Sequence, residues 1–168
     1  MYSPDPTDQE RTAAAGNEQN LSARVFLTER SAKQLLCKLD DRCRLLSPRE
    51  RKAVLVAFAM CGKALVGAAY DAVRLSRDVD LADPSDIAAN IDAVTLLEVK
   101  STGRETINDS LTGYFFNITA AELLTAQALK HQYRFGFLNT VRGEIQELGI
   151  AEVLARAKAI YPAYHIRF

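Results

Sequence analysis

Apolar residues recur at helical spacing after a polar start to the chain. Residues 1–20 are polar, contain two prolines and carry almost nothing to bury, so we expect them to form a disordered tail. Residues 22–46 place their leucine, valine and phenylalanine side chains at the spacing of one or two amphipathic helices. The first part of the chain is therefore predicted to be helical.

A second helix is predicted to begin after Ser47, where a capping serine, a proline and Glu50 follow in the order of a capping box. It would continue through the apolar run 53–70 and as far as Leu75. The two glycines inside this run are either tolerated, at about 1 kcal/mol each, or divide it into two helices. The run is rich in alanine, so we expect it to pack closely against a sheet or against a second copy of the chain.

The pattern then changes to short alternating runs, which predict strands. Residues 77–84 fit a short edge strand or an acidic loop, and residues 86–100 fit a hairpin that turns about Asn90. Residues 101–113 are polar and are predicted to be a loop. The remaining chain predicts a strand over 114–118, a capped helix over 119–131, a strand over 133–141, helix over 142–160 with a break near Gly149, and a last strand over 163–168.

Helices interspersed with a mixed sheet predict an α/β fold. At 168 residues the chain is long enough for one domain with its own core. We expect three parts: a tail over 1–20, an N-terminal helical region over 21–76, and an α/β core over 77–168.

Charge is unevenly distributed although the net charge is zero. Residues 21–52 hold nine Lys and Arg against four Asp and Glu, whereas residues 53–97 carry a net charge of −3. A basic segment of this kind fits either an ordinary solvated helix or a surface that meets a polyanion.

Three cysteines without metal or redox spacing indicate a reducing compartment, and we expect a cytoplasmic protein. No signal peptide is evident at the N-terminus. The apolar run 53–70 contains Lys63 and several small residues, which favours a buried helix over a membrane span.

Candidate chemistry lies on the predicted strand that ends at Lys100. Side chains alternate across a strand, so Glu98 and Lys100 share one face while Leu97 and Val99 point to the other. If residues 86–100 form a hairpin, Asp86 joins them from the neighbouring strand. Two carboxylates suit Mg²⁺ or Mn²⁺, and a lysine beside them suits metal-assisted phosphodiester hydrolysis. A solvent-facing Glu-x-Lys pair is the ordinary structural alternative.

The order Asp86, then Glu98-Val99-Lys100, then strand, helix and strand resembles the PD-(D/E)xK nuclease superfamily, over about residues 80–141. This resemblance implies a restriction-endonuclease-like fold and a nuclease that acts on DNA and depends on Mg²⁺ or Mn²⁺. Separately, an apolar face on residues 53–70 left exposed by the core would favour a protein partner or a homodimer. The resemblance also implies that Asp86 and Glu98 bind the metal and that Lys100 and Glu122 are catalytic. Asp83 rivals Asp86, and Glu122 is also the third residue of a capping box. Four further residues would line the substrate groove: Ser101, Thr102, Gln127 and Lys130.

Another class of function fits the same residues. A protein of this fold that has no catalytic activity could bind nucleic acid or serve as a protein-interaction module. Metal binding separates the two possibilities.

Overall fold

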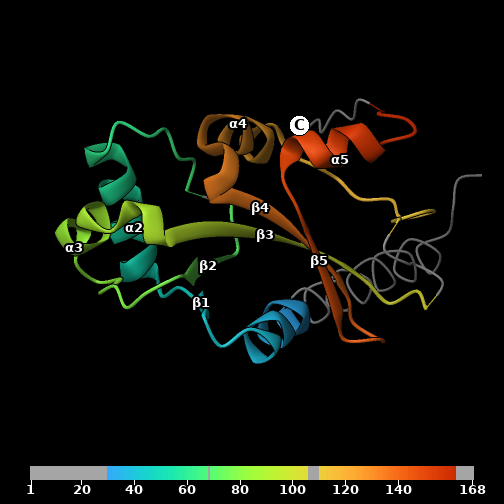
Figure 1. Ribbon diagram of the computed structural model, residues 1–168, viewed down its shortest axis with the longest axis horizontal. Coiled ribbons are helices and arrows are strands. Elements are labelled where there is room, and N and C mark those ends of the chain that lie inside the picture. Colours follow the sequence, from blue (N-terminus) through green and yellow to red (C-terminus); the bar gives the residue numbers. More distant parts are fainter. Residues whose placement is uncertain (1–29, 68, 106–109, 162–168) are drawn as a thin grey trace, which may run out of the picture.

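A mixed sheet of five strands forms the centre of the computed structural model, which describes residues 30–67, 69–105 and 110–161 (Figure 1). The strands lie in the order β1-β2-β3-β4-β5, which is also their order along the chain. Only the β3–β4 pair is parallel, because helix α4 connects the end of β3 to the start of β4; the other neighbouring strands are antiparallel. The strands are β1 (Cys43–Leu45), β2 (Ala72–Leu75), β3 (Val94–Thr102), β4 (Tyr133–Asn139) and β5 (Glu144–Leu148).

Strand β3 is the central strand, and its alternating side chains reach two separate cores. Val94 and Leu96 belong to the larger core, together with residues of α2, α3, α4 and α5. Leu97 and Val99 belong to a smaller core on the opposite face, where Leu36 of the helical residues 30–39 packs against them. Helices therefore cover both faces of the sheet, with α4 and α5 on one side and the 30–39 helix on the other (Figure 1).

Two helices begin at the capping boxes that the sequence predicts. Ser47 caps α2 (Pro48–Met60), and Thr119 caps α4 (Ala120–Leu129). In each, the capping hydroxyl accepts the backbone N–H of a glutamate three residues on, and that glutamate accepts the N–H of the capping residue. The other described helices are the 30–39 helix, α3 (Pro84–Ala89), α5 (Ile150–Arg156) and the short 3₁₀ turns η1 (Ile91–Ala93) and η2 (Lys130–Gln132).

The predicted apolar helix is shorter than expected. Helix α2 ends at Met60, and Gly62, whose φ of +68° is easily adopted only by glycine, follows the last turn. Its apolar face packs on the sheet of the same chain, with Ala57 and Phe58 fully buried. The region 21–76 is not purely helical, because β1 and β2 lie in it and pair with the rest of the sheet.

Three predicted elements differ from the structure. The prediction of a hairpin over 86–100 is wrong, because residues 84–89 form helix α3. Asp83 caps this helix by accepting the N–H of Ser85. Residues 114–118 are an extended loop without strand partners, fixed instead by aromatic packing of Tyr114 and Phe116 on Phe137. Residues 144–148 form strand β5 in a segment predicted as helix, because Gly143, with φ +66°, turns the chain back along β4.

Other expectations are met in part. Residues 77–83 form a loop rather than an edge strand, and strands β3 and β4 and helix α4 occur where the sequence predicts them. The predicted tail over 1–20 and the last strand over 163–168 lie outside the described residues. No helix among the described residues is long and apolar enough to cross a membrane.

Candidate active site

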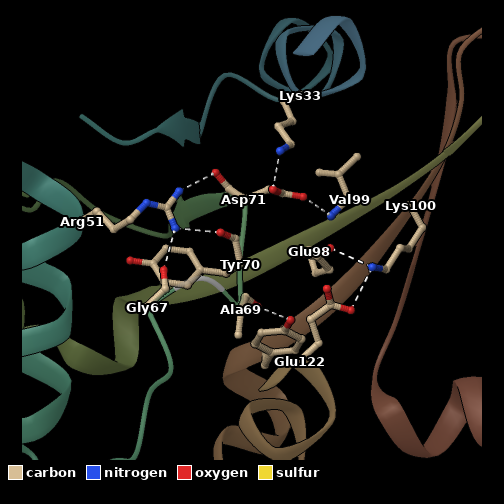
Figure 2. A network of polar contacts seen from close by, with 11 residues as sticks. Lys33, Arg51, Gly67, Ala69, Tyr70, Asp71, Glu98, Val99, Lys100 and Glu122 are labelled. Carbon is tan, nitrogen blue, oxygen red and sulfur yellow. Dashed lines mark hydrogen bonds and ion pairs between the residues drawn. The ribbon is translucent and has the colours of Figure 1, made fainter. Parts of the chain in front are cut away.

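A buried glutamate and a lysine lie on the same face of β3, as the alternation of the strand predicts. Glu98 is only 7% exposed, and the Nζ atom of Lys100 lies 2.8 Å from its Oε1 atom. Lys100 also lies 2.9 Å from Oε2 of Glu122, on the first turn of α4 (Figure 2). The ammonium group of Lys100 therefore bridges two buried carboxylates.

Glu122 has both of the roles that the sequence leaves open for it. Its Oε2 atom accepts the N–H of Thr119 at 3.2 Å, which completes the capping box of α4. The same oxygen contacts Lys100, so capping the helix fixes this carboxylate beside β3. Capping thus orients a side chain of the candidate site.

The third carboxylate comes from Asp71, which the sequence analysis does not single out. Strand β2 begins at Ala72, opposite Leu97, and the chain before it leaves the sheet. The Asp71 N–H donates to the carbonyl of Leu97 at 2.8 Å, and its Oδ2 atom accepts the N–H of Val99 at 2.9 Å. The Asp71 side chain thus takes the place of a strand partner, next to the position of Glu98.

Arg51 of α2 holds the segment that presents Asp71 (Figure 2). Its guanidinium donates to the carbonyls of Gly67, Tyr70 and Asp71 at 3.2, 2.8 and 3.4 Å. It also lies 4.4 Å from the ring centroid of Tyr70, within range for a cation–π contact. On the other side of the segment, the hydroxyl of Tyr133 donates to the carbonyl of Ala69. These contacts give an irregular loop a defined position beside β3.

Burial and like charges together raise the pKa of Glu98 to about 8. Desolvation is the largest cause, followed by the negative charge of Asp71; Glu122 adds to the rise, whereas Lys100 opposes it. Burial alone would lower the pKa of Lys100, but the two glutamates more than offset this effect and raise it. The three acidic residues Asp71, Glu98 and Glu122 therefore outnumber the two lysines that contact them, Lys33 and Lys100.

Asp86 does not take part in this arrangement. It lies in α3, where its side chain accepts the N–H of Asp80 at 2.7 Å and the amide of Asn90 at 3.1 Å. Helix α3 precedes the start of β3, and Glu98 lies four residues further along that strand, roughly 13 Å at the usual rise. The sequence analysis expected Asp86 beside Glu98 because it placed both in a hairpin. Asp86 lies in α3 instead, so the two residues are not brought together. Asp83, the rival of Asp86, caps α3.

The four residues predicted to line the groove lie on two elements. Ser101 and Thr102 are half-buried at the end of β3, and the carbonyl of Thr102 accepts the N–H of Thr140 at 2.9 Å. Gln127 and Lys130 are exposed on α4 and η2. Their expected contact with substrate stays a prediction.

Metal ligation is not preformed in the arrangement described above. Across residues 30–67, 69–105 and 110–161, no group of three or more His, Cys, Asp and Glu side chains could hold a metal ion as it stands. All three cysteines are free. The oxygens of Asp71, Glu98 and Glu122 instead contact the N–H of Val99 and the ammonium groups of Lys33 and Lys100.

Comparison with known proteins adds no family to these observations. No family model matches the chain, and neither the search of curated proteins nor the search of solved structures finds a match. The class of protein that the fold defines is an α/β domain with a mixed five-stranded sheet.

Proposed function

We propose that the protein is a metal-dependent nuclease that hydrolyses phosphodiester bonds of DNA through Asp71, Glu98 and Lys100. The observation that carries the proposal is the pair of buried glutamates, Glu98 and Glu122, that both contact Lys100, with Asp71 on the neighbouring segment close enough for its charge to raise the pKa of Glu98 (Figure 2). Lysine and carboxylates in this arrangement suit hydrolysis of a phosphate ester, because the transition state is an anion. Asp71 replaces Asp86 in the role that the sequence resemblance implies.

The donor set fits a hard divalent cation such as Mg²⁺ or Mn²⁺. Asp71 and Glu98 would hold it, since Mg²⁺ usually takes one or two protein carboxylates and keeps several waters. The raised pKa of Glu98 supports this assignment, because clustered buried carboxylates repel each other until a cation is present. When bound, the metal would polarise the phosphate and activate a water molecule.

Lys100 would stabilise the charge that develops on the phosphate and orient the attacking water. Its side chain is 12% exposed, and its ammonium group is oriented by the carboxylates of Glu98 and Glu122. Glu122 positions Lys100 from the first turn of α4, so this residue acts through the lysine. A group held in this way keeps its geometry without rearranging during the reaction.

A restriction-endonuclease-like arrangement of the sheet is part of the proposal. In its support, β1, β2 and β3 are antiparallel neighbours, and α4 leads from β3 to a parallel β4. The candidate site lies between β2 and β3, where β2 begins. DNA as the substrate is supported by the basic composition of residues 21–52, which includes Lys33.

Two substitutions test the proposal, because Glu98 and Lys100 would do different jobs. Glu98→Ala should abolish both Mn²⁺ binding, measured by titration calorimetry, and cleavage of supercoiled plasmid and single-stranded DNA. Lys100→Ala should leave metal binding intact or tighter, since a positive charge is removed, and should slow cleavage by about a hundredfold or more.

Binding of DNA without metal binding or cleavage would contradict the proposal. In that case the protein is a binding module without catalytic activity. The four charged side chains then have a structural role, namely those of Asp71, Glu98, Lys100 and Glu122.

A further inference from the structure

Asp71 is held from the opposite face of the sheet as well as from β3. Its Oδ1 atom lies 2.6 Å from the Nζ atom of Lys33, and its Oδ2 atom accepts the N–H of Val99 at 2.9 Å (Figure 2). The Asp71 side chain is 13% exposed and that of Lys33 is 27% exposed. Both oxygens of the proposed metal ligand are therefore in contact with donors, and one of these donors carries a positive charge.

Packing fixes the position from which Lys33 reaches the carboxylate. Lys33 lies on the 30–39 helix between Ala32, which is 1% exposed, and Leu36, which is fully buried. Both anchors belong to the smaller core, against Leu97 and Val99 of β3. A shift of this helix would disturb the core, so Lys33 does not depend on a flexible loop for its position.

We propose that Lys33 is a built-in competitor of the divalent cation for Asp71, and so sets the metal concentration at which the site fills. This inference rests on the proposed function, because it assigns Asp71 as a metal ligand. The ammonium group neutralises Asp71 while no metal is present, and a cation that arrives at the same carboxylate is repelled by it. Filling the site requires the contact between Lys33 and Asp71 to break or lengthen.

Removal of the charge at residue 33 tests this competition, because it should increase the affinity for metal rather than decrease it. Lys33→Gln should tighten Mn²⁺ binding, measured by titration calorimetry at neutral pH, by roughly fivefold to thirtyfold. A partly exposed charge contact contributes a factor of up to about five per unit charge, and the ion carries two charges. Loss of a purely structural contact would weaken binding or leave it unchanged.

Three variants serve as controls. Lys38→Gln makes the same change at an exposed position of the same helix and should bind Mn²⁺ as the wild type does. Lys33→Arg keeps the charge and should also match the wild type. Asp71→Asn, alone or combined with Lys33→Gln, should lose Mn²⁺ binding, because the gain from Lys33→Gln requires the Asp71 carboxylate as a ligand.

The outcomes separate this inference from the proposed function. If the wild type binds Mn²⁺ and Lys33→Gln binds it no more tightly than Lys38→Gln, competition by Lys33 is overturned and the nuclease proposal stands. If the wild type binds Mn²⁺ and Lys33→Gln binds it more tightly than Lys38→Gln does, the competition is supported. If neither binds the ion, both proposals are overturned.

Discussion

The raised pKa of Glu98 predicts that the metal-free protein loses stability as the pH rises. The unfolded carboxyl releases its proton near its ordinary pKa of 4.5, whereas the folded one keeps it until about pH 8. Between these values the folded state binds more protons than the unfolded state, so the free energy of unfolding falls with increasing pH and levels off above pH 8. Stability from this group is thus fully present below pH 4.5 and lost towards pH 8.

The size of the effect follows from the two pKa values. From pH 5.5 to pH 8, the difference in proton binding lowers the free energy of unfolding by about 2 to 3 kcal/mol, at about 1.4 kcal/mol per pKa unit. Glu98→Gln removes the titrating group and should flatten this part of the pH dependence. At pH 8 the variant should be more stable than the wild type, because a neutral side chain replaces a buried carboxylate among like charges.

Urea denaturation at a series of pH values measures the difference between the two proteins. The exposed Glu105 provides a matched control, because Glu105→Gln should follow the wild type throughout. At pH 8, Mg²⁺ at a hundredfold excess over its dissociation constant should stabilise the wild type by about 2.7 kcal/mol and leave Glu98→Gln unaffected. Parallel pH profiles for the wild type and Glu98→Gln would refute the reasoning.

Two further substitutions test the core and the loop that carries the site. Ala57→Asp should destabilise the protein by more than about 4 kcal/mol in thermal or urea unfolding, because it places an unpaired charge at a fully buried position, whereas Ala59→Asp on the exposed side of α2 should be near neutral. Arg51→Ala should weaken Mn²⁺ binding about tenfold to a hundredfold in a calorimetric titration, since it frees the carbonyls around Asp71. Unchanged Mn²⁺ affinity in a folded Arg51→Ala protein would show that this loop does not position Asp71.

Local patterns in the sequence predict the parts of the fold that depend on neighbouring residues. The alternation of residues 95–100 predicts the common face of Glu98 and Lys100, and the structure confirms it on the central strand. Both capping boxes are confirmed as well, because a cap needs only a side chain and the backbone three residues away. The Lys100–Glu122 contact joins a residue whose position follows from strand alternation to a residue whose position follows from a capping box.

Asp71 escapes sequence analysis because its partners are distant and its segment is irregular. It lies 28 positions before Val99, at the end of an apolar run that reads as helix. The two glycines in that run, Gly62 and Gly67, are the signal of a break, and the short β-prone run after Asp71 is the signal of a strand. Neither shows that the aspartate side chain replaces a strand partner, because that depends on where β2 leaves the sheet.

Lys33 illustrates a second limit, because the sheet separates it from Glu98 and Lys100. Its helix packs on the smaller core, and its ammonium contacts Asp71, the residue before the start of β2. A charge pattern along the chain identifies Lys33 as one of nine basic residues in a segment. Which of them meets a carboxylate is decided by tertiary packing alone.

Cleavage of DNA by two aspartate variants tests the central claim most directly. The wild type, Asp71→Asn and Asp86→Asn are compared on supercoiled plasmid and single-stranded DNA with Mg²⁺ or Mn²⁺, after each is shown to be folded. Asp71 as a ligand of the active site predicts cleavage by the wild type and by Asp86→Asn, and loss of cleavage by about a hundredfold or more in Asp71→Asn. Full activity of Asp71→Asn, or loss of activity only in Asp86→Asn, would contradict the assignment of the site to Asp71, Glu98 and Lys100.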